Sequence, residues 1–488
     1  LLLGKGMHFT VILRILGMLL MLFSSAMVIP LLLAVLADDS TITGFLAALS
    51  ITFFAGLTMW LPVRFARHEL RIRDGFLITS LFWIVRGLFG ALPFALTDTL
   101  ALTPVEAIFE SISGLTTTGA TVITGLDTLP RSILLYRQLL QWLGGIGIIV
   151  VAVAVLPMLG IGGMQLYRAE TPGPSKDSKL TPRITGTAKA LFMVYAALTA
   201  VCALAYFAAG MSGFDAICHA FSTVAIGGFS THDASMGYFD SNVILLICTL
   251  FMVISAINFG LHFLVWRRRS LAIYSKDSET RFYIGVVLIC IAVTCSYLIL
   301  SKTLSPTDSL VHGVFQAVSI TTTTGFATQD FAYWPTFLPI MLLMFSFMCG
   351  CVGSTGGGIK AMRLMLIFKQ GEREPKQLVH PAAIIPLKVG KRRVEATVIS
   401  AVWSFFAVYM WAFIGIMLVL MATGLDFTTA FSAVAASMNN LGPGLGAVAS
   451  NYSSISDPAK AILCFAMLLG RLEVFTLLVL FTPAFWRR

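Results

Sequence analysis

Four short polar segments, each built around a glycine, carry the residues of this sequence that could do chemistry. They read "SGLTTTGAT" (113–121), "STVAIGGFST" (222–231), "SITTTTGFAT" (319–328) and "NNLGPG" (439–444). Glycine adopts a positive φ at little cost, so such a segment can aim successive backbone carbonyls at one point. Rings of carbonyl oxygens can replace the water shell of a monovalent cation, and threonine can add a hydroxyl oxygen. The four segments therefore predict a site for a dehydrated cation.

The register of the four segments follows from a recurring glycine, at positions 119, 228, 325 and 442. A serine precedes the first three of these glycines by six positions. In the fourth segment Ser437 precedes Gly442 by five, so Gly444 competes for the same place. The residues predicted to line the site are Thr117, Thr118, Gly119, Ile226, Gly227, Gly228, Thr323, Thr324, Gly325, Asn440, Leu441 and Gly442. Because no ring of carboxylates accompanies them, a monovalent ion is favoured over calcium or magnesium.

A short apolar segment precedes each of these turns, at 104–115, 213–222, 307–319 and 426–437. A helix needs about 20 residues to cross a bilayer, so these segments enter the membrane and return on the same side. Their carboxyl ends carry partial negative charge and point towards the proposed site. Close packing of small residues explains one such turn equally well, but four turns of the same construction favour a shared aqueous path.

The composition indicates a polytopic membrane protein. The 488 residues are 57% hydrophobic and 11% charged, with a mean hydropathy of +0.89. Ten apolar runs are long enough to span a bilayer. They lie at approximately 9–36, 43–64, 75–97, 130–158, 187–210, 240–266, 281–301, 336–368, 394–423 and 458–486. The net charge of +10 comes from basic clusters on one side of this topology, which indicates a cytoplasmic side with both termini and not a nucleic-acid site.

The order of long and short segments divides the chain into five parts. Residues 1–73 hold two spans, and 74–168, 169–270, 271–380 and 381–488 each hold a span, a short helix, a glycine turn and a second span. The predicted fold is all-α, with ten transmembrane helices and the four repeats in a pseudo-fourfold arrangement. The eight cysteines are expected to be buried core residues without disulfides. The residues before Met7 carry no part of the fold prediction.

A glycine-rich stretch, "CGCVGSTGGGIKA" (349–361), interrupts the span at 336–368. Its glycines are Gly350, Gly353, Gly356, Gly357 and Gly358. Each costs about 1 kcal/mol relative to alanine in a helix, so the span is expected to unwind there. The stretch lacks the Gly-Lys-Ser/Thr ending of a phosphate loop, and no nucleotide is expected to bind this chain. Either a close helix crossing or a mobile loop that obstructs the path accounts for it.

Arginines at membrane depth need a partner or water. Arg471 is expected to face the path and oppose a cation, with Glu110 or a carbonyl of the glycine-rich stretch as possible partners. Arg86 and Arg137 are expected to form buried pairs with carboxylates of the short helices. The sequence has no HExxH or GxSxG motif and no paired carboxylates inside a span, so an enzyme is not predicted.

The strings "QWLGGIGI" (141–148), "GGFSTHD" (227–233) and "NNLGPG" resemble those of the TrkH family, the bacterial membrane subunits of the Trk/Ktr/HKT superfamily of potassium transporters. The resemblance implies potassium uptake through one selectivity filter in the bacterial inner membrane. It also implies a gate formed by the glycine-rich loop and Arg471, a homodimer, and cytosolic TrkA-type subunits that bind nucleotides. A secondary transporter that couples potassium to protons or sodium is the alternative.

Overall fold

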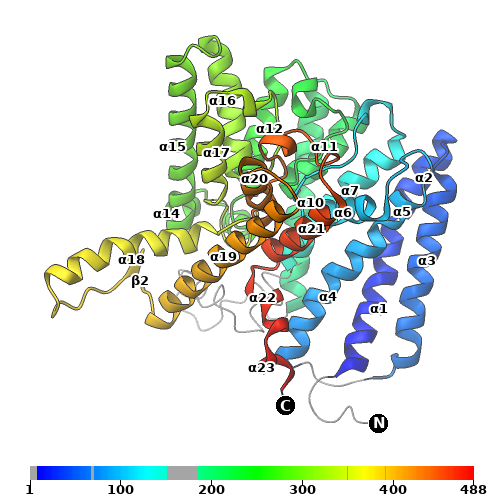
Figure 1. Ribbon diagram of the computed structural model, residues 1–488, viewed down its shortest axis with the longest axis horizontal. Coiled ribbons are helices and arrows are strands. Elements are labelled where there is room, and N and C mark those ends of the chain that lie inside the picture. The colour runs from blue at the N-terminus through cyan, green and yellow to red at the C-terminus, as the bar shows by residue number, and fades with distance from the viewer. Residues whose placement is uncertain (1–7, 67–70, 151–183, 349, 391, 488) are drawn as a thin grey trace.

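The computed structural model describes residues 8–66, 71–150, 184–348, 350–390 and 392–487. The described chain is almost entirely helical, and its long helices stand side by side (Figure 1). Its only β structure is an antiparallel pair of two-residue strands, β1 (Lys388–Val389) and β2 (Arg392–Arg393). The prediction of a helical protein with membrane-type apolar helices is confirmed.

The N-terminal part is a helical hairpin that packs against the first repeat. It comprises α1 (Phe9–Ala26), α2 (Val28–Ala37), α3 (Ile42–Trp60) and the 3-10 turn η1 (Leu61–Val63). Gly17 and Gly56 let α1 and α3 cross closely, because a Cβ added at Gly17 would lie 2.7 Å from the carbonyl oxygen of Gly56. Small residues commonly permit this approach between membrane helices.

Each predicted repeat contains a long helix, a short helix and at least one further helix. The first holds α4 (Ile72–Gly90), α5 (Leu92–Ala95), α6 (Pro104–Leu115), η2 (Leu126–Thr128) and α7 (Arg131–Val150). The second holds α10 (Ile184–Ala208), α11 (Gly213–Ala225), η4 (Ser235–Tyr238), α12 (Asn242–Ser255) and α13 (Phe259–Arg268). The predicted boundary at 168 and the end of the predicted span 130–158 lie outside the described residues.

The third repeat holds α14 (Ala272–Lys276), α15 (Ser278–Leu300), α16 (Pro306–Thr321), η5 (Phe331–Tyr333), α17 (Phe337–Ser346) and α18 (Ala361–Val379). The fourth holds β1, β2, α19 (Ala396–Ala422), α20 (Phe427–Met438), η6 (Gly446–Val448), α21 (Asp457–Arg471), α22 (Phe475–Leu478), η7 (Val479–Phe481) and α23 (Pro483–Trp486). Between α17 and α18 none of the described residues is helical, as the glycines of that stretch predicted.

The four short helices α6, α11, α16 and α20 start where the sequence predicted, because each begins with a side-chain cap. Thr103, Ser212 and Ser305 accept hydrogen bonds from the backbone N–H of Glu106, Asp215 and Asp308. Asp426 caps α20 in the same way through Thr429. A cap satisfies an N–H that has no partner within the helix, and an acidic residue in the first turn suits the helix dipole.

Six helices of the described chain are long and apolar enough to cross a membrane, or eight if two bent pairs each count as one span. The predicted spans at 240–266 and 458–486 each correspond to one of these bent pairs. α12 and α13 meet at 95°, where the side chain of Asn258 accepts a hydrogen bond from Gly260 and starts a new helix. α21 and α22 meet at 109°, where Glu473 and Val474 both have positive φ.

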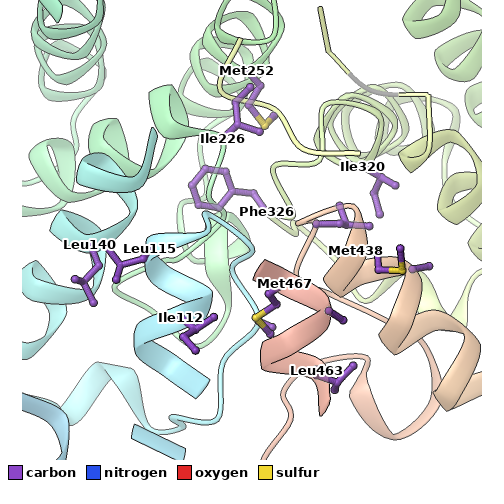
Figure 2. Packing of buried hydrophobic residues seen from close by; sticks show 14 of the residues in the cluster. Ile112, Leu115, Leu140, Ile226, Met252, Ile320, Phe326, Met438, Leu463 and Met467 are labelled. Carbon is purple, nitrogen blue, oxygen red and sulfur yellow. The ribbon is translucent and has the colours of Figure 1, made fainter. Parts of the chain in front are cut away.

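The short helices converge on one buried core that all four repeats share. Figure 2 shows Ile112, Ile226, Ile320 and Met438, one from each repeat, within this cluster. The seven cysteines that the structure describes are buried, as predicted. Cys349 lies outside the described residues. The core therefore fixes the carboxyl ends of four short helices, where the glycine segments begin.

Candidate cation site

The four glycine segments share one backbone conformation. Their first site residues, Thr117, Ile226, Thr323 and Asn440, have φ between 53° and 63°. Gly119, Gly228, Gly325 and Gly442 follow two positions later, with φ of 81°, 79°, 84° and 94°. A left-handed φ is uncommon for a β-branched residue such as threonine or isoleucine, so the surroundings must hold each segment in this shape.

The residue before each glycine is tied back to the short helix by its N–H. Thr118 donates to the carbonyl of Ser113 over 2.9 Å, and Gly227 donates to that of Ser222 over 2.9 Å. In the fourth segment the N–H of Leu441 donates to the carbonyl of Ala436 over 2.8 Å. Ala436 thus takes the place of the serine, and Gly442 rather than Gly444 is equivalent to the other three glycines.

The segments touch one another in a closed cycle. A Cβ added at Gly119 would lie 2.1 Å from the carbonyl oxygen of Gly227, and one at Gly228 would lie 2.0 Å from that of Thr324. A Cβ at Gly325 would lie 2.0 Å from the oxygen of Leu441, and one at Gly442 would lie 2.7 Å from that of Thr118. Each glycine thus abuts the carbonyl of the next repeat, and the fourth returns to the first.

All four glycines line one cavity of about 370 Å³. Within the described chain, the carbonyl oxygens of Thr118, Thr324 and Leu441 accept no hydrogen bond. Carbonyls in this state, close to a cavity and to one another, can act as oxygen ligands for a cation. The hydroxyls of Thr116 and Thr118 lie 2.7 Å apart, as do those of Thr322 and Thr324, on the inner side of two segments.

A buried ion pair between α6 and α7 is hydrogen-bonded to the first segment. Arg137 donates from Nε to Oε1 of Glu110 over 2.8 Å, and both side chains are almost inaccessible. Glu110 also accepts from the N–H of Val122, and Arg137 donates to the carbonyl of Ser230 in the second repeat. The predicted pair of Arg137 with a short-helix carboxylate is confirmed. A buried pair held by additional hydrogen bonds fixes the geometry of its surroundings.

In the described part of the chain Arg86 forms no ion pair with a carboxylate, so the short-helix pair predicted for it is wrong. Its guanidinium instead lies over the rings of Phe23 and Phe82, 4.8 and 4.6 Å from their centroids. An aromatic face attracts a cation, and the N-terminal hairpin supplies one of these two faces. The sequence could not indicate this contact because Phe23 lies far from Arg86 along the chain.

Gln141 is a site residue that the sequence reasoning missed. Its side chain is fully buried on α7 and donates from Nε2 to the carbonyl oxygen of Gly227 over 2.6 Å. Its Oε1 accepts from the hydroxyl of Ser222 over 2.6 Å. The glutamine stands first in the string "QWLGGIGI", and a polar side chain in an apolar span was the available signal.

The outer end of the cavity is bordered by a network around His232. His232 donates from Nδ1 to Asp127 over 2.5 Å, and its Nε2 lies 3.5 Å from Asp215. This hydrogen bond lowers the pKa of the Asp127 carboxyl below its ordinary value. Asp233 accepts from the N–H of Gly125 over 3.0 Å, so the loops after the first and second segments are joined.

The glycine-rich stretch passes directly beneath the inner end of the segments. The N–H of Gly357 donates to the hydroxyl of Thr323 over 3.0 Å. A Cβ added at Gly357 would lie 2.0 Å from the carbonyl oxygen of Asn439, so only glycine fits there. Gly353 and Gly358 have φ of 78° and 61°, and Gly350 and Gly356 are also buried in this stretch. The stretch therefore lies against the third and fourth segments.

Arg471, the last residue of α21, donates hydrogen bonds to two backbone carbonyls. One of them belongs to the glycine-rich stretch, which was one of the two partners predicted for this arginine. It donates from Nη1 to the carbonyl of Thr355 over 2.9 Å and from Nη2 to that of Gly144 over 3.3 Å. Its side chain is 2% exposed. Glu473 instead pairs with Arg363, Nη2 to Oε2, over 2.5 Å. No carboxylate among the described residues forms an ion pair with Arg471.

Glu279, at the start of α15, holds both ends of the same stretch. Its Oε1 accepts from the N–H of Val352 over 2.7 Å and from that of Met362 over 3.2 Å. The side chain is buried. One carboxylate thus joins the entry and the exit of the glycine-rich stretch.

The chain is similar to known transport proteins over nearly its whole length. The family model "TrkH: Cation transport protein" matches residues 42–488. The Trk system potassium uptake protein TrkH of Halomonas elongata is 57% identical over 482 residues, covering 99% of this chain and 100% of that protein. That of Escherichia coli K12 is 53% identical over 485 residues, covering 99% and 100%. The crystal structure of the potassium transporter TrkH from Vibrio parahaemolyticus superposes with a TM-score of 0.92 at 51% identity, covering 99% of this chain and 100% of that one.

The family model spans the glycine segments, the stretch beneath them and Arg471, and the relatives cover the chain from end to end. The chain belongs to the TrkH family of cation transport proteins.

Proposed function

We propose that this chain takes up potassium through a channel-like pore whose selectivity filter is made of backbone carbonyls. The closed cycle of contacts among Gly119, Gly228, Gly325 and Gly442 is the observation that supports this most strongly. Four carbonyl-bearing segments that abut in a ring around one cavity can surround a single dehydrated ion. The printed function of the relatives, potassium uptake, agrees with this proposal.

The chemistry of the ring favours a monovalent ion. The ligands offered are neutral oxygens, and the described chain has no cluster of three or more His, Cys, Asp or Glu side chains suited to a metal ion. Calcium and magnesium sites in proteins are usually built with carboxylates. Potassium is therefore the transported substrate and not a bound cofactor.

The gate in this proposal is the stretch from Gly350 to Gly358 together with Arg471. Its support is the position of Gly357 against Thr323 and Asn439, which closes the inner end of the filter. Arg471 adds a buried positive charge that opposes a cation at this level. A cytosolic TrkA-type nucleotide-binding subunit would move the stretch, and a homodimer is the proposed assembly of the membrane subunit.

The proposed topology has ten spans, with the four repeats in the same orientation around one axis. In support, the start of α1 and the short helix α23 lie at the same end of the molecule (Figure 1). Both termini are then cytoplasmic in a bacterial inner membrane, where basic residues favour the inner side. The parts 1–73, 74–168, 169–270, 271–380 and 381–488 remain the proposed units.

A secondary transporter that couples potassium to protons or sodium is the second candidate. Such transporters often carry inverted repeats, with broken helices that meet at the bilayer midplane. Two bent helix pairs, α12 with α13 and α21 with α22, favour it over a simple channel. The cycle of equivalent contacts favours repeats of equal orientation, and therefore the channel-like pore.

Ion flux in liposomes tests the proposal. The purified protein should pass potassium and rubidium down their gradients, at rates that do not change when sodium or proton gradients are removed. Vesicles loaded with a fluorescent potassium indicator report the flux, and vesicles without protein are the control. Strict dependence on a proton or sodium gradient would establish the second candidate instead.

A further inference from the structure

Gln141 contacts the second glycine segment, the one that differs most from the other three. Its amide is held by three hydrogen bonds, because Nε2 donates to the carbonyl of Gly227 over 2.6 Å while Oε1 accepts from Ser222 Oγ and from the N–H of Phe229 over 2.6 and 3.2 Å. The N–H of Phe229 can only donate, so the amide oxygen must face it. The NH₂ group therefore faces the carbonyl of Gly227, and its orientation is fixed by the chain.

The second segment lacks a side chain at this place, and Gln141 fills the space. The equivalent residues of the other segments are Thr118, Thr324 and Leu441, whereas the second segment has Gly227. A Cβ added at Gly227 would lie 2.3 Å from Cδ of Gln141. With the Gln141 side chain held in this place, only glycine fits at position 227.

In the fourth repeat, Met467 occupies the position equivalent to Gln141. Gly144 and Gly470 pack in the same way, since an added Cβ would lie 1.9 Å from the carbonyl oxygen of Leu115 and 2.1 Å from that of Met438. Three residues before these glycines stand Gln141 and Met467. A thioether cannot donate a hydrogen bond, so this repeat has no counterpart of the bond to the carbonyl of Gly227.

We propose that Gln141 is a specificity-determining residue of the filter, an inference that rests on the proposed function. Four backbone carbonyls lie against the four glycines. In the described chain, only the carbonyl of Gly227 accepts a hydrogen bond. Selectivity between alkali ions depends on the field strength of the carbonyl dipoles as well as on cavity size. A donor on one carbonyl lowers the field strength, which favours the larger and more weakly hydrated potassium over sodium.

The test is the ratio of potassium to sodium flux in liposomes for Gln141→Met. This change copies Met467 and removes the donor, so the ratio is expected to fall about fivefold, which converts to about 1 kcal/mol, the net worth of one hydrogen bond. Gln138→Met is the matched control, because Gln138 is fully buried on the same helix and neither polar atom of its amide has a partner among the described residues. The control should keep the wild-type ratio.

Total flux and melting temperature separate a change of selectivity from misfolding. Misfolding lowers both quantities but leaves the ratio of potassium to sodium flux unchanged. Gln141→Leu is the second variant if Gln141→Met does not fold, because it also removes the donor and adds no charge. A folded variant of either kind with an unchanged ratio overturns the role of Gln141. The proposed function itself would be refuted if neither the wild type nor Arg471→Gln, the variant expected to open the path, passes potassium, whatever the Gln141 variants do.

Discussion

The substitution Gly325→Ala places one methyl group where the third segment meets the fourth. The added Cβ would lie 2.0 Å from the carbonyl oxygen of Leu441, and real Cβ atoms essentially never come closer than 3.0 Å to such a neighbour. The oxygen of Leu441 must therefore move by about 1 Å, or the segment must change its φ of 84°. Keeping that φ with an alanine costs roughly 1–2 kcal/mol in addition.

Either response changes the position of a carbonyl in the proposed filter. We expect the potassium flux of Gly325→Ala in liposomes to fall at least tenfold, which corresponds to about 1.4 kcal/mol and lies within the range of the backbone strain alone. Gly442→Ala should lose less, because its added Cβ would lie 2.7 Å from the oxygen of Thr118. The predicted loss of potassium flux is therefore larger for Gly325→Ala than for Gly442→Ala.

Gly285→Ala is the matched control for this series. Gly285 lies in α15, and an added Cβ would meet no atom within 4 Å. Alanine favours a helix over glycine by about 1 kcal/mol, so this variant should conduct normally and melt no earlier than the wild type. If Gly325→Ala folds and conducts like Gly285→Ala, the contact between the third and fourth segments has no part in conduction, and the reasoning from the cycle fails.

Three further changes test the gate and the outer rim. Arg471→Gln should raise potassium flux more than tenfold, because a unit charge opposes a cation that passes at an assumed distance of about 10 Å by about 1.7 kcal/mol at an effective dielectric constant of about 20; unchanged flux would remove Arg471 from the path. Glu279→Ala should also raise flux measured without a regulatory subunit, because it leaves the N–H groups of Val352 and Met362 without their acceptor; flux equal to the wild type would show that the carboxylate does not hold the stretch. The lowered pKa of Asp127 means that its bond to His232 stabilises the fold at pH above the ordinary value of 3.8 and stops doing so as pH falls through the lowered pKa. The difference in melting temperature between wild type and Asp127→Asn should therefore be constant at neutral pH and vanish in acid, and a difference that persists in acid would contradict this assignment.

The short helices and the glycine segments could be predicted because their signals are local. A run such as 104–115 is too short to cross a bilayer, begins with a capping threonine and ends at a turn. Each of these features can be read within a dozen residues. The register of Gly442 could not be decided in this way, because Ala436 replaces the serine that marks the other segments. The hydrogen bond from Leu441 to Ala436 decides it.

Most features that the sequence did not indicate depend on contacts between distant residues. Arg137 pairs with Glu110 and Arg86 contacts Phe23 and Phe82, yet both arginines looked alike as single charges in apolar runs. The bend between α12 and α13 depends on a cap at Asn258, a residue type that also occurs inside straight helices. For the arginines the deciding partners, Glu110 and Phe23, belong to other helices. At Asn258 the partner, Gly260, is local, but an asparagine alone does not predict a cap.

The cycle of glycine contacts has a direction. Each glycine abuts the carbonyl of the repeat that follows it in the chain, and none abuts that of the repeat before it. A lesion in one segment should therefore be relieved by a second-site suppressor in the following repeat, so a change at Gly325 should select compensating changes near Leu441 and not near Gly227. Joining the four repeats in one polypeptide is what allows such suppressors to arise one at a time, since a ring of identical subunits would change at every position together.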